Sequence, residues 1–304
     1  MPYFLGIDGG GTKTTCAVGD ERSLLAEATA GPSNIVRVGE AKARESLHQA
    51  VRQACAAAGI SPEQVTRTCI GVAGAARPEL AAIVGSVLAE ILPSPIDVVG
   101  DMATALEAAL GEGPGVIVIA GTGSIAYGRD PQGKTLRAGG WGFAVGDEGS
   151  AHWIGRQAVS AVLRGTDQGD QHDSPLLKAL FRAWGVTSVS DLARAGNSIP
   201  PPDFAALFPA VSGSTDELAR QVLRTAGREL AQLADVVISR LFDQADIAAV
   251  PVAMTGGVFR HAELVRQVFY NELRRLDARA DVRQQVVEPV EGAVRMARKA
   301  AAQI

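Results

Sequence analysis

The sequence predicts an α/β protein made of two duplicated units, each with the element order βββαβαβα and with a cleft between them. Two observations support this. A buried strand, a glycine-rich turn and a second strand occur at 3–18, and the same series recurs at 115–127. After each hairpin, short apolar runs alternate with segments of helical periodicity. A series that repeats along 304 residues indicates two domains of ordinary size.

The first hairpin is the most informative stretch. An apolar run with aromatic and β-branched members, Tyr3–Ile7, ends at Asp8 and is followed by Gly9–Gly11 and by β-prone residues. Consecutive glycines let backbone N–H groups converge on a polyphosphate, and Asp8 is placed to hold the accompanying metal. The spacing and the strand that follows fit neither a dinucleotide fingerprint nor a P-loop. An ordinary turn without a ligand is the alternative.

Breaker residues divide the rest of the first unit. A third strand at 23–28 ends before the breaker Gly31–Asn34. An apolar stripe then predicts a helix that stops at Gly59, and Ser61 with Pro62 predicts the N-cap and first residue of another. The stripe consists of Leu47, Val51, Ala54, Cys55 and Ala58. The remaining expected elements are a strand at 68–73, a helix at 78–91, a strand at 96–99 and a helix at 102–110.

The opening pattern recurs after the breaker cluster 111–114. A buried strand at 115–120 leads through Gly121–Ser124 into a strand at 125–127. The expected elements that follow are a strand at 134–138, helices at 150–163, 175–184 and about 215–243, a strand at 250–254, a helix at about 262–276, a strand near 282–287 and a helix from about 290. These elements place the first domain at 1–111 and the second at 112–289. We expect the terminal helix, about 290–304, to complete the second series and to pack back on the first domain.

The Gly-, Pro- and Ser-rich segment 165–214 is expected to be a helical insertion or lid in the second unit, although the sequence does not place its elements.

Composition excludes several classes of protein. The chain is 47% hydrophobic and 20% charged, and its net charge of −4 leaves no basic surplus for nucleic acid. No apolar run approaches the ~20 residues of a membrane span, and no signal segment opens the chain, so a cytoplasmic protein without membrane contact is expected. Neither disulfides nor zinc sites are expected from the odd, unclustered cysteines and the dispersed histidines. These residues are Cys16, Cys55, Cys69, His48, His152, His172 and His261.

Five motifs in order resemble a known superfamily. They are Asp8–Thr12, Gly121–Ser124, Gly139–Gly142, Gly146–Ser150 and Met254–Val258. Three are similar to the phosphate and adenosine motifs of the actin, Hsp70 and sugar-kinase superfamily. The two between 139 and 150 are similar to the BadF/BadG/BcrA/BcrD group, which contains the N-acetylglucosamine kinases. The resemblance spans nearly the whole chain and implies two RNase H-like domains in an actin-like ATPase fold, which close around ATP, Mg²⁺ and a sugar.

The resemblance also assigns roles to residues. Asp101 follows the strand at 96–99, where ligands of α/β proteins usually lie, and is implied to be the general base; a helix N-cap is the alternative. For Asp147, the alternative role is that of a negative charge at the N-terminus of the helix expected at 150–163. For the Ser33-Asn34 loop, the alternative is a simple Asx turn. The implied sugar-binding residues are Ser33, Asn34, Gly140, Trp141, Gly142 and Asp147, which combine close backbone, an aromatic plate and a carboxylate.

The resemblance also implies nucleotide-binding residues, which are mainly glycine and hydroxyl residues from both units. Asp8 is implied to bind Mg²⁺ through water. Gly256 and Gly257 end a strand, where missing side chains would let adenosine lie on the backbone; a plain strand-to-helix turn is the alternative. The implied nucleotide-binding residues are Gly10, Gly11, Thr12, Lys13, Thr122, Gly123, Ser124, Gly256 and Gly257.

The implied reaction is phosphorylation of N-acetylglucosamine to its 6-phosphate. Val36 stands where, by the resemblance, the animal enzymes have an aromatic residue, so glucosamine, N-acetylmuramic acid or another hexose stays open. An ATPase activator of a dehydratase or reductase is a second class, but it would need cysteines in loops for an iron–sulfur cluster. A sugar-sensing regulator would carry a DNA-binding segment, and here only Met1 and Pro2 precede the first strand. A homodimer is compatible with the resemblance, because related kinases are often dimers.

Overall fold

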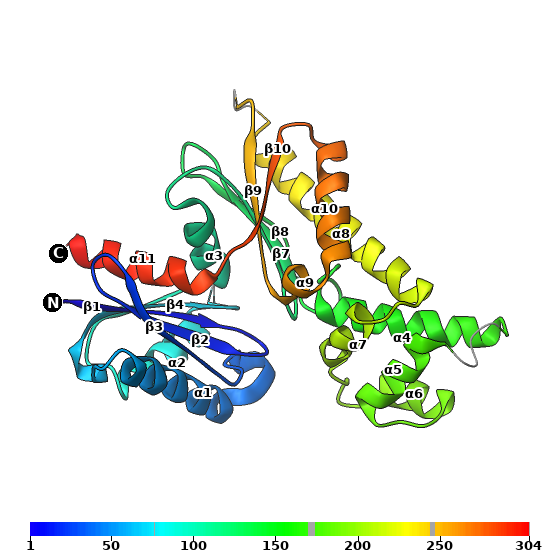
Figure 1. Cartoon of the computed structure of the whole chain (residues 1–304). Coiled ribbons are helices and arrows are strands. Elements are labelled where there is room, and N and C mark those ends of the chain that lie inside the picture. The colour runs from blue at the N-terminus through cyan, green and yellow to red at the C-terminus, as the bar shows by residue number, and fades with distance from the viewer. Residues whose placement is uncertain (76, 170–173, 244–246, 304) are drawn as a thin grey trace. The chain divides into compact units, whose positions relative to one another are not determined.

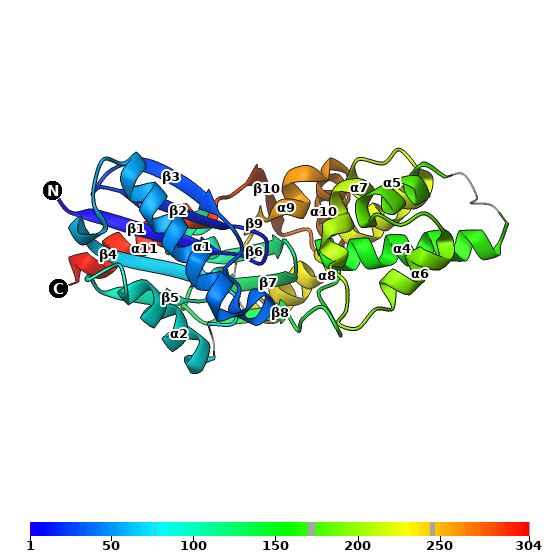
Figure 2. The same cartoon turned by 90° about the horizontal axis from the view of Figure 1, so that it is seen from below.

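The computed structural model of the chain contains two compact α/β units (Figures 1 and 2). Unit 1 consists of Met1–Gly113 together with Val287–Ile304, and unit 2 consists of Pro114–Val286. The structure describes residues 1–75, 77–169, 174–243 and 247–303. Within these residues, no helix is long and apolar enough to cross a membrane.

Unit 1 contains a five-stranded sheet in the order β3-β2-β1-β4-β5. Its strands are β1 (Tyr3–Gly9), β2 (Thr14–Gly19), β3 (Leu24–Ala30), β4 (Val65–Val72) and β5 (Ile96–Val99). Its helices are α1 (Ile35–Ala57), the 3₁₀ helix η1 (Pro62–Gln64), α2 (Pro78–Ala89), α3 (Asp101–Leu110) and α11 (Pro289–Ala302). Only β2 runs antiparallel to its neighbours. The carboxyl ends of the other four strands therefore lie at one edge of the sheet, which we call the carboxyl edge.

Both faces of the central strand β1 are buried. Leu5 and Ile7 belong to a core shared with α1 and α2, whereas Phe4 belongs to a second core under α11. Side chains alternate along a strand, so this pattern covers the sheet on both faces. A Cβ atom at Gly6 would lie 2.5 Å from the backbone nitrogen of Val294, which shows that α11 rests directly on β1 where a side chain is missing.

Unit 2 repeats this sheet strand for strand. Its strands are β6 (Gly115–Ala120), β7 (Ser124–Arg129), β8 (Thr135–Gly139), β9 (Val250–Thr255) and β10 (Ala280–Val286), in the order β10-β9-β6-β7-β8. The pairing is again antiparallel on both sides of the second strand and parallel elsewhere. Equal strand order and equal pairing directions confirm the predicted duplication.

The helices of unit 2 lie mostly between β8 and β9. They are α4 (Ala151–Asp167), α5 (Pro175–Trp184), α6 (Val189–Gly196), the 3₁₀ helix η2 (Phe204–Leu207), α7 (Phe208–Ser212) and α8 (Glu217–Leu241), followed after β9 by α9 (Gly257–His261) and α10 (Glu263–Leu276). The described residues of the segment 165–214 are thus largely helical, and apolar side chains among them join the core of unit 2. Residues 170–173 of this segment, including His172, lie outside the described residues.

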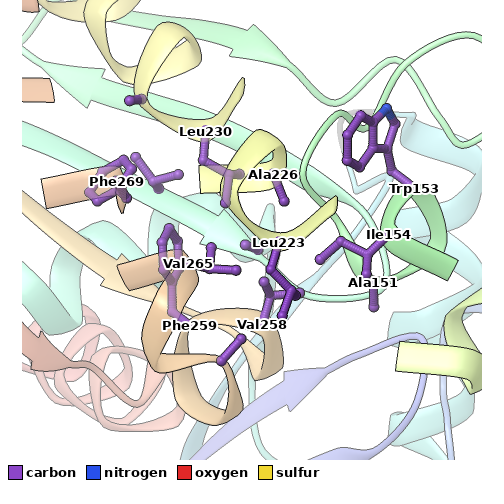
Figure 3. Close-up of a cluster of buried hydrophobic side chains, with 14 of the residues drawn as sticks. Ala151, Trp153, Ile154, Leu223, Ala226, Leu230, Val258, Phe259, Val265 and Phe269 are labelled. Atoms are coloured by element: carbon purple, nitrogen blue, oxygen red, sulfur yellow. The ribbon is translucent and has the colours of Figure 1, made fainter. Parts of the chain in front are cut away.

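Helix α8 lies at the centre of the unit 2 core. Figure 3 shows its Leu223, Ala226 and Leu230 among apolar side chains from three other helices. These neighbours are Ala151, Trp153 and Ile154 of α4, Val258 and Phe259 of α9, and Val265 and Phe269 of α10. The helices between β8 and β9 are therefore part of the same core as the helices that follow β9.

The predicted strands are all present, with ends that differ by a few residues. The largest difference concerns α1, which begins at Ile35, well before the apolar stripe that predicted it. Gly39 interrupts this helix with φ 77°, so its first turn is separate from the rest. The short helices α6, α7, α9 and η2 were not predicted individually, although α6, α7 and η2 lie in the segment that was expected to be helical.

Candidate active site

The first element of the candidate site is the hairpin that joins β1 to β2. Across the turn, the Gly10 N–H donates to the Lys13 carbonyl at 3.0 Å. A Cβ atom at Gly10 would lie 2.7 Å from that oxygen, so the turn closes in this way only around glycine. Gly11 is half-buried, and Thr12 and Lys13 at the tip are exposed. The predicted glycine hairpin is present, and its contact with phosphates stays a prediction.

Two carboxylates lie together at the carboxyl edge of unit 1. Asp8 is near the end of β1, and Asp101 is the first residue of α3, directly after β5. Burial raises the pKa of Asp8 to about 7, with repulsion from Asp101 and Glu288 adding to it and the charge of Lys13 opposing it. Asp8 is therefore a carboxylate that only a nearby positive charge would keep fully ionised at neutral pH.

Asp101 is half-buried at the N-terminus of α3. Gly100 occupies the N-cap position that the alternative reading gave to Asp101. The Met102 backbone N–H donates to the Asp101 carboxylate at 3.0 Å. Burial raises the pKa of Asp101, although backbone amides lower it in part. Desolvation increases the proton affinity of a carboxylate, which suits a general base.

The Ser33-Asn34 loop lies against the first hairpin. The Gly10 carbonyl accepts hydrogen bonds from the backbone N–H groups of Ser33, at 3.1 Å, and Asn34, at 3.2 Å. Ser33 is buried, whereas the Asn34 side-chain oxygen Oδ1 is buried without a hydrogen-bond partner among the residues that the structure describes. A buried acceptor without a partner is costly, so a ligand hydroxyl or amide is its natural donor.

The raised pKa of Asp8 predicts a pH-dependent stability. Between pH ~4 and ~7 the folded state holds a proton on Asp8 that the unfolded chain has released. The free energy of unfolding therefore falls as pH rises through this window, and the contribution of this proton is fully lost once pH has passed about 7. In chelator-treated protein, Asp8→Asn should therefore raise the Tm more at pH 8 than at pH 5. The exposed Asp281, changed to Asn, is the control. Equal shifts of Tm at both pH values would contradict the prediction.

In unit 2, the hairpin between β6 and β7 is held by the loop 139–150. The Gly121 N–H donates to the Gly123 carbonyl at 2.9 Å, and the Gly121 carbonyl accepts from the Ala151 N–H at the start of α4, also at 2.9 Å. The Ser124 hydroxyl donates to the Glu148 carbonyl at 2.7 Å. Thr122 is half-buried. The predicted second hairpin is present, and its contact with a nucleotide stays a prediction.

Asp147 organises this loop. Its backbone is left-handed, with φ 61°, and its carboxylate accepts hydrogen bonds from the backbone N–H groups of Gly142 and Ser124. Burial raises the pKa of Asp147, and these amides lower it. Two carboxylate oxygens have more acceptor sites than two amides use, so a sugar hydroxyl can still be bound. The helix alternative fits Ser150 better, because Ser150 is the N-cap of α4 and accepts from the Trp153 N–H.

Asp147 is expected to support both the fold and the binding of sugar. Asp147→Ala leaves two amides unpaired and alanine in a left-handed conformation, which should cost roughly 3 kcal/mol or more of unfolding free energy. Asp147→Asn keeps an acceptor oxygen and a side chain that tolerates this conformation, so it should cost about 1 kcal/mol. Urea unfolding measures both values. A higher sugar KM in the well-folded Asp147→Asn variant would indicate that Asp147 contacts the sugar. An unchanged KM would mean that Asp147 acts only in the fold.

Aromatic side chains of the same loop are exposed. Trp141 is 70% exposed, and the Arg137 guanidinium lies 4.6 Å from its ring centre. Phe143 is 50% exposed and packs against His152 of α4, with ring centres 4.8 Å apart and planes tilted by 42°. Gly140 and Gly142 on either side of Trp141 have positive φ values. The loop therefore exposes the Trp141 ring, which is held by a cation–π contact with Arg137 of the same unit.

Gly256 and Gly257 follow β9 and differ in their surroundings. Gly256 has φ 104°, and a Cβ atom there would lie 2.3 Å from the Ala120 carbonyl oxygen at the end of β6. A Cβ atom at Gly257 would meet nothing within 4 Å. Gly256 is thus required by packing against the second hairpin, whereas only Gly257 has open space beside it.

Sequence reasoning missed three residues near these elements. Thr14 begins β2 and bonds the Ser33 loop, Glu288 raises the pKa of Asp8, and Arg137 lies over Trp141. The sequence holds a weak signal for Arg137, because it lies two residues before a glycine-rich loop. The roles of Thr14 and Glu288 depend on tertiary neighbours that the sequence does not show.

Each unit thus gathers its candidate residues at the carboxyl edge of its own sheet. Two sheets of equal order, each opened by a glycine-rich hairpin, define an actin-like ATPase fold. The chain belongs to the BadF/BadG/BcrA/BcrD ATPase family, whose model matches residues 5–297. Membership of this family implies the use of ATP.

Curated relatives and a solved structure match most of the chain. An N-acetylmuramic acid/N-acetylglucosamine kinase of Clostridium acetobutylicum is 32% identical over 294 residues, 90% of each chain. An N-acetyl-D-glucosamine kinase of Dictyostelium discoideum is 29% identical over 312 residues, 97% of each chain. A Chromobacterium violaceum structure, whose protein carries a provisional N-acetylglucosamine kinase assignment, is 28% identical with a TM-score of 0.76 over 97% of this chain and 99% of that one.

Proposed function

We propose that this protein is an amino-sugar kinase that transfers the terminal phosphoryl group of ATP to the 6-hydroxyl of N-acetylglucosamine. The observation that carries the proposal is the unpartnered buried oxygen of Asn34 beside the glycine hairpin of unit 1. A phosphate-type turn and a vacant acceptor for a polar ligand share one edge of one sheet with Asp101. The names of the relatives supply the chemical class of the ligand.

The proposed roles follow the chemistry of each group. Asp101 accepts the proton of the attacking hydroxyl, and its raised pKa strengthens it as a base. The two hairpins hold the phosphates through backbone N–H groups, Thr12, Lys13 and Thr122. Binding of the sugar falls to the Ser33-Asn34 loop and to Gly140–Gly142 with Asp147. Gly257 offers open backbone for adenosine.

The residues around Asp8 fit a magnesium ion. Asp8 is close enough to Asp101 and Glu288 for their charges to raise its pKa, and a cation would relieve that repulsion. Carboxylate oxygens are the ligands that Mg²⁺ prefers, with water completing its shell. Mg²⁺ neutralises the charge of the ATP phosphates when it is bound. Asp8 would hold the ion through water, and Lys13 would address the distal phosphates.

A sugar panel tests the proposal. Purified protein with ATP and Mg²⁺ is given N-acetylglucosamine, glucosamine, N-acetylmuramic acid and glucose, and the phosphorylated sugar is measured by mass spectrometry. N-acetylglucosamine should give the highest kcat/KM, with glucose lower by more than about tenfold because it lacks the N-acetyl group. Faster turnover of N-acetylmuramic acid would move the assignment to that sugar, since Val36 is 62% exposed and would leave room for a larger substituent.

The alternative function, an ATPase activator of a dehydratase or reductase, is disfavoured by the positions of the cysteines. Cys16 and Cys55 belong to one core of unit 1 and Cys69 to the other, each at most 1% exposed. An iron–sulfur cluster needs thiolates that can reach it, and burial raises the pKa of all three thiols. If the panel gave no phosphorylated sugar while ATP was hydrolysed at full rate, the kinase proposal would be wrong.

A further inference from the structure

Thr14, the first residue of β2, is buried and has a hydroxyl group with two partners. Its Oγ1 lies 2.8 Å from the Gly31 carbonyl oxygen and 2.7 Å from the Ser33 hydroxyl oxygen. A hydroxyl carries one proton and a carbonyl only accepts, so Thr14 donates to Gly31 and Ser33 donates to Thr14. The Ser33 proton is therefore engaged within the protein, and Ser33 can serve a ligand only as an acceptor.

Four hydrogen bonds hold the loop to the hairpin. Two run from the backbone of Ser33 and Asn34 to the Gly10 carbonyl, and two join Thr14 to Gly31 and Ser33. A Cβ atom at Gly9 would lie 2.9 Å from the Ser33 hydroxyl oxygen, so the loop also rests against the hairpin without a gap. We call these four bonds the Thr14 network.

The network joins two groups that would bind different ligands. Gly10 lies in the turn whose N–H groups are suited to phosphate, and Asn34 carries the buried oxygen without a partner among the described residues. Because the Gly10 carbonyl accepts from both residues of the loop, a displacement of Gly10 would disturb the hydrogen bonds that position Asn34. A ligand that orders the hairpin therefore orders the Asn34 loop as well.

We infer that Thr14 is a positioning residue that couples the binding of sugar to the binding of nucleotide through the contact between hairpin and loop in unit 1. This inference rests on the proposed function, which supplies the two ligands. Thr14 itself contacts neither ligand. It sets the position of Asn34 relative to Gly10, and the hydrogen bonds carry the coupling.

Calorimetric titration tests the inference. The Kd for N-acetylglucosamine is measured with and without the non-hydrolysable analogue AMPPNP, and the ratio of the two values is the coupling factor. In the unchanged protein this factor should exceed one. Thr14→Val keeps the shape but removes the hydroxyl, so it should raise the sugar Kd about tenfold and bring the coupling factor close to one. Thr14→Ser, which keeps the hydroxyl, should restore most of the coupling.

Two further variants separate coupling from folding. Ser33→Ala removes the same bond from the side of the loop and leaves the Thr14–Gly31 bond in place, so it should lower the coupling factor even if Thr14→Val folds poorly. Thr29→Val makes the matched change at an exposed residue of β3 and should alter neither Kd nor coupling. An unchanged coupling factor in folded Thr14→Val and Ser33→Ala would overturn the inference. Absence of sugar binding and phosphorylation in the unchanged protein would instead contradict the proposed function.

Discussion

Replacement of Asp101 by asparagine is expected to lower kcat by about 10²–10⁴. The change keeps the shape of the side chain and an oxygen that can accept from the Met102 N–H, but it removes the basic oxygen that would take the proton of the sugar hydroxyl. The Kd values for ATP and sugar should change by less than about threefold. A loss in kcat without a loss in binding identifies an interaction made in the transition state.

The exposed Asp281 of β10 provides the matched substitution, and Asp281→Asn should leave kcat unchanged. The pH profile gives a second measure. Because burial raises the pKa of Asp101, the acidic limb of kcat should fall at a higher pH than an ordinary aspartate would give, and this limb should be absent from the residual activity of Asp101→Asn. Turnover near that of the unchanged protein would remove Asp101 from the role of base.

Gly256→Ala is expected to cost roughly 3–5 kcal/mol of unfolding free energy and to abolish nucleotide binding. The backbone at Gly256 has φ 104° and ψ 163°, a conformation that is essentially restricted to glycine. The added Cβ would also overlap the Ala120 carbonyl and come within 3.0 Å of the Gly121 nitrogen. The clash would therefore displace the second hairpin itself. Urea unfolding and titration with ATP measure the two effects.

Gly257→Ala is the control that separates structure from binding. Gly257 begins α9 in open space, and alanine is the better helix former, so stability should be kept or slightly increased. If adenosine lies against this backbone, the KM for ATP should still rise several-fold. Equal loss of stability in both variants would contradict the packing account of Gly256, and an unchanged KM in Gly257→Ala would remove that residue from the nucleotide site.

The fold could be predicted well because the signals were local. Each hairpin combines a buried strand with glycines that no ordinary two-residue turn requires, and Gly59, Ser61 and Pro62 mark element ends by backbone chemistry. The start of α1 was missed because Gly39 separates its first turn and Val36 there is exposed, so no apolar stripe extends to Ile35. Helix α6 was missed because one buried residue, Leu192, is too little for a period.

The site was less predictable because its geometry depends on residues distant in the sequence. The sequence identified Asp147 as a polar residue in a glycine-rich loop, but not the left-handed backbone or the amides of Gly142 and Ser124 that hold its carboxylate. In the sequence Thr14 is an ordinary β-prone residue, whereas in the structure its hydroxyl group bonds Gly31 and Ser33. The motifs show which residues to examine, whereas the hydrogen bonds show what each can do.

The return of α11 to unit 1 has a consequence for synthesis of the chain on the ribosome. Phe4, Ala17 and Cys69 share their core with Val290 and other residues of α11, which are translated after the whole of unit 2. Unit 1 therefore lacks part of the cover of one face of its sheet until α11 has been made, while unit 2 is continuous from Pro114 to Val286. The later domain is expected to become native first, so a nascent chain halted before residue 287 should be cut by protease in its earliest-made part.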